Sequence, residues 1–256
     1  MNLNNHTILI TGGTSGIGLE FAKQLIALGN TVIITGRNQM KLEETKKQFP
    51  KVHTFQNDVS NPKAITELYE EVITQFPNLN IIINNAGEMR KINLHHTDID
   101  IQDITREIDI NLCGPIRMVQ QFLPHLKTQK KAAIINVTSG LALVPFPISP
   151  IYGATKSGLR SYTKSLRIQL KNTNIQVFEL VAPAVKTPLN DKFANDVDTK
   201  TFMNADKLVA ITLKNIEKNQ LEITPGSAKA LKILSRLAPA FLLNQMSKSV
   251  DKILNL

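Results

Sequence analysis

Short apolar runs alternate with stretches of helical periodicity along most of the chain. The runs are rich in β-branched residues and predict buried strands over 8–10, 31–35, 52–56, 80–83, 132–137, 175–181 and 221–224. Between the first two runs, Ile17, Phe21, Leu25 and Leu28 recur at helical spacing and therefore share one helix face. Further helices are expected over 39–48, from about 60 to 75, over 104–126, from 151 onward and over 206–217.

This alternation predicts an α/β fold. A length of 256 residues fits one large domain or two small ones, and no low-complexity tract, repeat or linker divides the chain. We therefore expect a single-domain, doubly wound sheet of about seven mostly parallel strands flanked by helices. With 42% apolar residues, the chain can bury a substantial core.

Residues 227–256 follow the last predicted strand and form an extension to the domain of residues 1–226. Leu231, Leu234 and Leu237 recur at helical spacing, Pro239 breaks the run, and Phe241, Leu242 and Met246 continue it. Lysines and arginines lie between them. Basic amphipathic helices can rest on anionic membranes. The interpretation we favour is that the extension packs on its own domain, over the substrate site, or on a partner subunit.

A glycine-rich turn follows the first predicted strand, in the sequence Thr11-Gly12-Gly13-Thr14-Ser15-Gly16-Ile17-Gly18. The first amides of a helix have no internal partners and lie at the positive end of its dipole, so such a strand–turn–helix can bind a phosphate. Glycine also lets the backbone approach a pyrophosphate closely. An ordinary turn would use glycine as well, so the residues further along the chain decide between the two interpretations.

The second predicted strand ends at Gly36-Arg37-Asn38. Arg37 follows Gly18 by 19 residues, about where a dinucleotide fold reads the ribose. An acidic residue there would bind the 2′-hydroxyl of NAD, whereas an arginine can bind a 2′-phosphate. The alternative is a solvated surface arginine. Arg37, with Asn38 beside it, favours NADP(H) over NAD(H).

The strongest chemical motif is Tyr152-Gly153-Ala154-Thr155-Lys156 in the helix that opens near 151. The i, i+4 spacing places the tyrosine and the lysine on one face. A free tyrosine has a pKa near 10, and a neighbouring ammonium stabilises the phenolate, so Lys156 is expected to lower the Tyr152 pKa. This pair alone is common in helices. Ser139, at a strand end 13 residues before Tyr152, turns it into a candidate catalytic group.

Taken in order, these motifs resemble the classical short-chain dehydrogenase/reductase family. The resemblance rests on Thr11-Gly12-x-x-x-Gly16-x-Gly18, on Asn84-Asn85-Ala86-Gly87 and on the Ser139, Tyr152 and Lys156 spacing, and it covers residues 6 to about 225. It implies a Rossmann-type sheet with strand order 3-2-1-4-5-6-7. It also implies a homodimer or homotetramer formed through the helices that carry Asn111 and Tyr152.

The resemblance implies an oxidoreductase that transfers a hydride reversibly between NADP(H) and a carbonyl or alcohol. Tyr152 would act as general acid/base, Ser139 would bind the substrate oxygen, and Lys156 would also hold the nicotinamide ribose. Asn111 would hold a water that extends a proton relay from the lysine. A cofactor-binding sensor or scaffold with little turnover is the alternative, but it would not need all of these catalytic positions to be filled.

The same resemblance implies a set of cofactor contacts. Asp58 and Val59 are expected at the adenine, although Asp58 could instead begin an ordinary loop. Ser15 stands where NADP-dependent members often have a basic residue, which leaves the preference to Arg37. Ala184 replaces a glycine, and because alanine tolerates positive φ poorly, its turn is expected to be slightly shifted. The full predicted set is Gly12, Thr14, Ser15, Gly16, Ile17, Gly18, Arg37, Asn38, Asp58, Val59, Asn85, Ala86, Gly87, Tyr152, Lys156, Pro183, Val185 and Thr187, with Thr187 at the nicotinamide amide.

The segments expected to contact substrate contain no motif that identifies the substrate. Leu141, Leu143, Val144 and Phe146 predict a largely apolar pocket and hence a hydrophobic or medium-sized carbonyl compound. Residues 189–202 are polar and weakly periodic, and we expect them to form a lid. A membrane-associated reductase of lipid substrates is the variant that the basic extension would favour.

Charge and cysteine content narrow the partners. The net charge of +9 comes from scattered basic residues, and tryptophan is absent, so nucleic acid is not an expected partner. Cys113 is the single cysteine, which together with a polar amino terminus predicts a cytoplasmic protein. No apolar run reaches the length of a membrane span. His95 and His96 are adjacent, so their side chains diverge, and we expect no metal site there.

Overall fold

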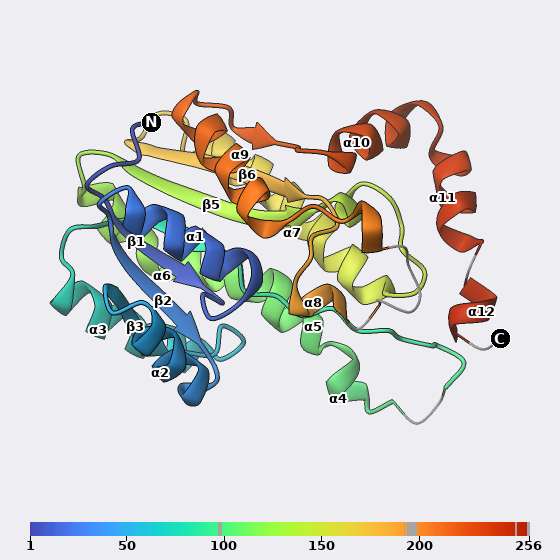
Figure 1. Ribbon diagram of the computed structural model, residues 1–256, viewed down its shortest axis with the longest axis horizontal. Coiled ribbons are helices and arrows are strands. Elements are labelled where there is room, and N and C mark those ends of the chain that lie inside the picture. The colour runs from blue at the N-terminus through green and yellow to red at the C-terminus, as the bar shows by residue number, and fades with distance from the viewer. Residues whose placement is uncertain (97–98, 192, 194–198, 249, 255–256) are drawn as a thin grey trace.

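Seven parallel strands form the central layer of the protein in a computed structural model, which describes all residues except 97–98, 192, 194–198, 249 and 255–256 (Figure 1). The strands are β1 (Thr7–Thr11), β2 (Thr31–Gly36), β3 (Val52–Gln56), β4 (Leu79–Asn84), β5 (Ala132–Ser139), β6 (Ile175–Ala182) and β7 (Glu222–Ile223). Their order, β3-β2-β1-β4-β5-β6-β7, confirms the predicted fold and the strand order that the resemblance implied.

The central strands are apolar on both faces because helices cover both sides of the sheet. In β1, Ile8 and Ile10 belong to one core, while Leu9 between them belongs to the other. Leu9 pairs in register with Ile33 of β2 and Ile82 of β4, so successive strands present matching faces. Continuous apolar runs of this kind are typical of a parallel sheet buried on both sides.

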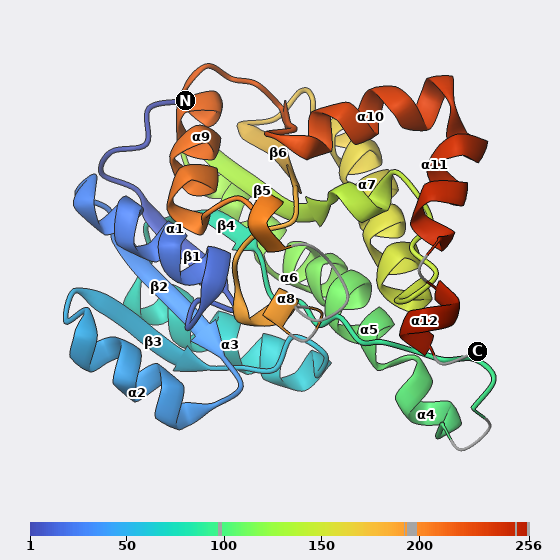
Figure 2. The ribbon, with the colours of Figure 1, turned by 45° about the vertical axis from the view of Figure 1, so that its right-hand side comes forward.

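Helices α1 (Gly16–Ala27), α2 (Gln39–Gln48) and α9 (Ala205–Glu217) contribute to the core on one face of the sheet. Helices α3 (Pro62–Gln75), α6 (Gly114–Thr128) and α7 (Pro150–Gln169) contribute to the core on the other face (Figures 1 and 2). The helices predicted over 39–48, to 75 and over 206–217 are thereby confirmed. Burial of each large aliphatic side chain stabilises the fold by about 1.5–3 kcal/mol.

The single helix predicted over 104–126 is wrong. The structure has two short helical segments, α4 (Ile101–Ile104) and α5 (Arg106–Ile108), then a π-helical turn, η1 (Asp109–Cys113), before α6 begins. The cause lies at Pro115, which has no N–H to donate to the carbonyl of Asn111 four residues earlier. The Gly114 N–H bonds instead to the Asp109 carbonyl, five residues back. The chain is therefore wider at Asn111 than a regular α-helix.

The carboxyl-terminal extension forms three helices, α10 (Ser227–Leu237), α11 (Pro239–Ser247) and α12 (Val250–Leu254). The predicted break at Pro239 is confirmed. Figure 2 shows the three helices following one another along one edge of the molecule. Val250, Ile253 and Leu254 pack against a small apolar cluster that includes Met89 and Tyr152, so α12 rests on the preceding domain.

Candidate active site

A cleft of about 510 Å³ opens beyond the carboxyl ends of the strands. Ligands of open α/β sheets bind at this edge. Of the predicted site residues, Gly18 and Asn111 do not line the cleft. Those that do are Gly12, Thr14, Ser15, Gly16, Ile17, Arg37, Asn38, Asp58, Val59, Asn85, Ala86, Gly87, Ser139, Tyr152, Lys156, Pro183, Val185 and Thr187.

The glycine-rich turn after β1 requires glycine for two separate reasons. Gly12 and Gly16 have positive φ angles of 66° and 54°, which side chains rarely adopt. Gly18 has a different role, because a Cβ there would lie 2.2 Å from the carbonyl oxygen of Gly12. Gly18 thus allows helix α1 to pack closely against the turn. Gly18 itself does not line the cleft.

The turn delivers the first amides of α1 to the cleft. Ser15 is the N-cap of this 12-residue helix, and its side chain makes no capping hydrogen bond. The amides at this end are unpartnered within the helix and lie at the positive end of its dipole. A cradle without Cβ atoms that faces a helix amino terminus fits a dinucleotide pyrophosphate.

Arg37 and Asn38 lie on the cleft where β2 ends, and both are exposed. Asn38 caps helix α2, since its Oδ1 accepts a hydrogen bond of 3.1 Å from the Lys41 N–H. Gln56 donates to the Arg37 carbonyl at 3.0 Å and fixes the backbone there. The guanidinium of Arg37 therefore projects from a fixed point at the cleft.

Asp58 has a structural role as well as a place on the cleft. Its Oδ1 accepts hydrogen bonds from the backbone N–H and the hydroxyl of Ser60, at 2.9 and 2.7 Å. These bonds stabilise the loop that begins at Asp58. Val59 lies next to it on the cleft and is 6% exposed.

Asn85 ties the turn after β4 to the turn after β1. Its Nδ2 donates to the carbonyls of Thr11 and Gly12, at 3.0 and 3.1 Å. Its backbone N–H donates to the Thr11 hydroxyl at 3.0 Å. The two turns that form the floor of the cleft are thus held at a fixed spacing, and Ala86 and Gly87 between them leave that floor without large side chains.

Ala184, which was expected to shift its turn slightly, lies in the turn after β6. Ala184 is not among the residues with positive φ, so alanine fits here without strain. Its carbonyl accepts a hydrogen bond of 3.0 Å from Met203, and Lys186 donates to the Met203 carbonyl at the same distance. Pairing with this second segment fixes the turn. Thr187 follows it and is 9% exposed at the cleft.

Ser139, Tyr152 and Lys156 all line this cleft. Tyr152 and Lys156 are 6% and 4% exposed, one helical turn apart on α7. Lys156 Nζ donates a hydrogen bond of 2.9 Å to the carbonyl of Val137 and lies 5.7 Å from the centroid of the Tyr152 ring. Ser139 Oγ accepts a hydrogen bond of 3.1 Å from the Leu141 N–H, so its own proton is available to another acceptor.

The electrostatics differ from the sequence expectation that Lys156 lowers the Tyr152 pKa. Burial raises the pKa of Tyr152 to about 12; a hydrogen bond with Ser139 opposes this change, and the Glu107 carboxylate adds to it. Burial also lowers the pKa of Lys156 to about 8. The lysine ammonium is bonded to a strand carbonyl, and the desolvation of the phenol outweighs its influence.

Asn111 lies behind the cleft, fully buried in the π-helical turn. Its Oδ1 accepts a hydrogen bond of 2.8 Å from the Glu88 N–H, and its Nδ2 donates to the Glu88 carbonyl at 2.8 Å. The same Nδ2 donates to the hydroxyl of Thr155 at 3.2 Å. Asn111 therefore joins the π-helical turn, the loop after β4 and helix α7.

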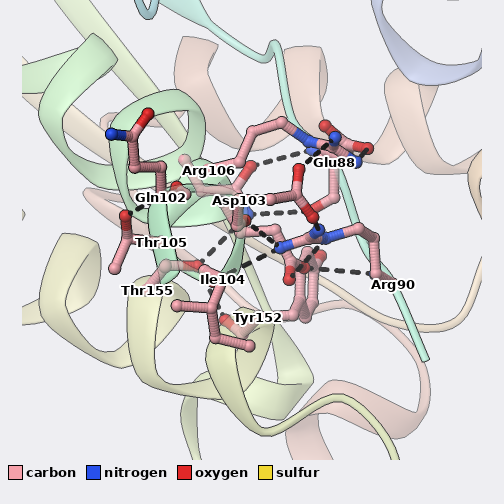
Figure 3. Close-up of polar contacts among 11 residues, drawn as sticks. Glu88, Arg90, Gln102, Asp103, Ile104, Thr105, Arg106, Tyr152 and Thr155 are labelled. Atoms are coloured by element: carbon pink, nitrogen blue, oxygen red, sulfur yellow. Dashed lines mark hydrogen bonds and ion pairs between the residues drawn. The ribbon is translucent and has the colours of Figure 1, made fainter. Parts of the chain in front are cut away.

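A charged network next to Tyr152 was missed by sequence reasoning (Figure 3). Glu107 is fully buried and accepts hydrogen bonds from the backbone N–H and Nε of Arg90, at 3.1 and 3.3 Å. Arg106 bridges Glu88 and Asp103 at 2.9 and 2.6 Å. Burial raises the pKa of Glu107, and its bonds with Arg90 oppose that change. A glutamate at an inward helical position four residues before Asn111 was the available sequence indication.

The wall beyond Tyr152 is largely apolar. Leu141 and Phe146 line the cleft as expected, whereas Leu143 and Val144 face a neighbouring hollow. Other apolar residues of the wall are Met89, Phe193, Leu231 and Met246. The described parts of the predicted lid reach the cleft through Leu189, Asn190, Phe193 and Phe202, while residues 192 and 194–198 lie outside the described residues.

The residues that the structure describes also bear on metal and membrane binding. They contain no group of three or more His, Cys, Asp or Glu side chains placed to hold a metal ion. In the same part of the chain, no helix has the length and apolar character needed to cross a bilayer.

The chain is similar in sequence to proteins of a known family. Residues 6–198 match the family model of the short chain dehydrogenases. The chain is 39% identical over 249 residues to the oxidoreductase DltE of Bacillus subtilis, covering 96% of this chain and 98% of that protein. It is 30% identical over 214 residues to the NADP-dependent 3-hydroxy acid dehydrogenase YdfG of Escherichia coli, covering 82% and 86% of the two chains.

Solved structures share the fold. A short chain dehydrogenase/reductase from Burkholderia phymatum in complex with NAD superposes with a TM-score of 0.83 at 21% identity, over 96% of both chains. A short chain dehydrogenase from Burkholderia cenocepacia in complex with NADP gives a TM-score of 0.82 at 21% identity, over 96% of this chain and 99% of the other. The fold described above is therefore one that holds either form of the cofactor in other proteins.

Proposed function

The chain belongs to the short-chain dehydrogenase/reductase family of oxidoreductases, and on this basis we propose that it transfers a hydride between NADP(H) and a carbonyl or alcohol. The observation that carries the proposal is the meeting of Ser139, Tyr152 and Lys156 beside a glycine-lined cleft. Gly12 and Gly16 together with the amino terminus of α1 would hold the pyrophosphate. When bound, the nicotinamide supplies or accepts the hydride.

In this proposal, each catalytic side chain has a separate role. The hydroxyl of Ser139 binds the substrate oxygen, and the phenol of Tyr152 gives or takes its proton. A pKa near 12 keeps Tyr152 protonated in the free protein, so it is ready to act as the acid in carbonyl reduction. Lys156 would hold the nicotinamide ribose, and its ammonium lies 5.7 Å from the centre of the phenol ring.

Asn111 acts through its backbone in the proposed proton relay. Its side-chain amide is occupied by Glu88 and Thr155, whereas its carbonyl lacks the helical donor that Pro115 cannot provide. We propose that this carbonyl holds the water of the relay next to Lys156. A water with such polar partners costs little free energy to bind.

Preference for NADP(H) rests on Arg37. Its guanidinium stands at the cleft edge where β2 ends, and it can form a bidentate contact with a 2′-phosphate. The relative YdfG carries NADP dependence in its name, which is compatible with this preference. The apolar wall of Leu141, Phe146 and Phe193 supports a largely apolar substrate, with residues 189–202 as its lid.

Assembly and location are part of the same proposal. We propose a homodimer or homotetramer formed through α6 and α7, as in the family. A single cysteine suits the reducing cytoplasm, where NADPH is available as a reductant. The domain of residues 1–226 would carry the chemistry, with residues 227–256 as an extension.

Substitution of Tyr152 by Phe tests the proposal. Turnover of NADPH with a panel of apolar aldehydes and ketones should fall by about 10²-fold or more, because general acid/base catalysis contributes that much. The affinity for NADPH, followed by nicotinamide fluorescence, should stay near that of the wild type. A fully active Tyr152→Phe variant would exclude the mechanism. Tight NADPH binding by a wild-type protein that turns over no carbonyl would favour the sensor alternative.

A further inference from the structure

Helix α10 is apolar on both of its faces. On the inner face, Ala228 is buried and Leu231 lines the cleft. On the outer face, Ile233, Leu234 and Leu237 are 50%, 37% and 77% exposed. Leu237 follows Ile233 by four residues and Leu234 by three, so its side chain lies next to both. A helix that only packed on its own domain would present polar residues to the solvent on that face.

Two more exposed apolar side chains lie on α11: Phe241 is 55% and Leu243 is 41% exposed. Because they are two residues apart, they point to opposite sides of that helix. Of the ten large apolar side chains that are exposed in the described residues, five lie between 233 and 243. Scattered exposed apolar residues need no explanation, but a contiguous group of them marks a surface that binds something. We call the exposed apolar residues of α10 together with the first of α11 the outer stripe: Ile233, Leu234, Leu237 and Phe241.

The surroundings of the outer stripe are positively charged. Lys229, Arg236 and Lys248 are exposed around it, and the sequence has no acidic residue from 223 to 250. The remaining basic residue of this segment, Lys232, bonds to Glu222 at 2.6 Å and anchors α10 to the last strand. The arrangement matches the interfacial amphipathic helix, which combines an apolar face with flanking lysine and arginine.

The charges around the outer stripe favour a lipid surface over a second copy of the chain as its binding partner. Two copies of the chain that met through this stripe about a two-fold axis would bring their Lys229 and Arg236 side chains together, with no carboxylate on the segment to neutralise them. Anionic lipid headgroups would neutralise the same side chains. The apolar residues would then enter the boundary between headgroups and acyl chains.

We propose that α10 and α11 dock the protein on an anionic lipid surface, with the outer stripe facing the bilayer. Leu231 and Met246 of the same two helices line the cleft, so a docked protein would hold its cleft next to the membrane. The docking itself does not depend on the proposed hydride transfer. No residue of the outer stripe lines the cleft.

Vesicle sedimentation tests this docking with the full chain. Wild-type protein should sediment with vesicles that contain phosphatidylglycerol and phosphatidylcholine, and much less with phosphatidylcholine alone. The double variant Leu237→Gln/Phe241→Gln should bind the anionic vesicles about tenfold or more weakly, because it loses two apolar side chains that would enter the bilayer. The variant Lys229→Gln/Arg236→Gln should also bind more weakly. Met40→Gln, which changes a side chain 68% exposed on α2, is the matched control and should bind like the wild type.

The outcomes separate docking from catalysis and from self-association. All variants should keep the circular dichroism spectrum and the NADPH affinity of the wild type, because the changed residues lie outside the cleft. Failure of the wild type to bind anionic vesicles would overturn the proposal, as would equal binding by the stripe variant. A stripe variant that instead converts an oligomer into a monomer in gel filtration would assign the surface to a second copy of the chain.

Discussion

Asn111 binds both backbone groups of Glu88, accepting a hydrogen bond from its N–H and donating one to its carbonyl, each at 2.8 Å. A side-chain amide thus replaces the backbone partner that the loop after β4 would otherwise need. The loop carries Ala86 and Gly87, which form the floor of the cleft. The geometry of the cleft therefore depends on a residue that does not line it.

Replacing Asn111 by Leu should destabilise the protein by about 1–3 kcal/mol, because the buried N–H and carbonyl of Glu88 lose their partners. Denaturant unfolding followed by circular dichroism measures this loss. The Asn244→Ala variant, which changes an exposed residue of α11, should stay within about 0.5 kcal/mol of the wild type. An Asn111→Leu variant as stable as this control would show that the clamp contributes little.

The charge of the Glu107 carboxylate should influence the pKa of Tyr152. Its carboxylate raises the pKa of Tyr152, so Glu107→Gln should lower that pKa from about 12. The ζ-carbon chemical shift of Tyr152 reports its ionisation, and Tyr152→Phe assigns the resonance among the three tyrosines. Glu44→Gln on the exposed face of α2 is the matched control and should leave the titration unchanged. An unchanged Tyr152 titration in Glu107→Gln would mean that Arg90 already neutralises the carboxylate.

Lys156 should make stability depend on pH in a defined window. Burial lowers its folded-state pKa from 10.5 to about 8, so between these values the unfolded chain binds more protons and the free energy of unfolding rises with pH. Lys156→Met removes the buried charge. The variant should gain up to about 3 kcal/mol over the wild type below pH 8, since each pKa unit corresponds to about 1.4 kcal/mol.

Denaturant midpoints of wild type and Lys156→Met at pH 7 and about pH 10 test this window. The difference between the two proteins should shrink as the pH rises, because the lysine is then neutral in both of its states. Above pH 10, Tyr152 works in the opposite direction: its raised pKa means that the unfolded chain ionises first, and stability falls. A difference that stayed constant with pH would show that Lys156 keeps its ordinary pKa in the fold.

The sequence predicts those parts of the fold that local patterns determine. Each strand is recognisable as a short run of β-branched residues, and the phosphate-binding turn is recognisable as glycines between a strand and a helix. Both features depend only on residues that are close together in the chain. The π-helical turn was missed, although Pro115 marks it, since its side-chain clamp on Glu88 joins residues 23 positions apart. The Tyr152 pKa was misjudged for the same reason: burial dominates it, and burial is not visible in the Tyr-x-x-x-Lys spacing.

The carboxyl-terminal extension shows a different limit of prediction from sequence. Leu231, Leu234 and Leu237 recur at helical spacing and would be assigned to one buried face. In the structure, Leu231 lines the cleft, whereas Leu234 and Leu237 are exposed with Ile233. Periodicity identifies an amphipathic helix but does not say which face meets the protein when both faces are apolar.

Arg37 should decide between the two forms of the cofactor. Replacement by Ala removes the guanidinium at the end of β2, so the Kd for NADPH should rise about tenfold or more, since hydrogen bonds between charged groups contribute about 1.5–3 kcal/mol. The Kd for NADH should change little. Lys47→Ala, which removes one positive charge from an exposed position of α2, controls for the overall field of the protein and should leave both Kd values near those of the wild type. Equal losses for NADPH and NADH would assign Arg37 to the turn itself, and no loss for either would make it a solvated surface arginine.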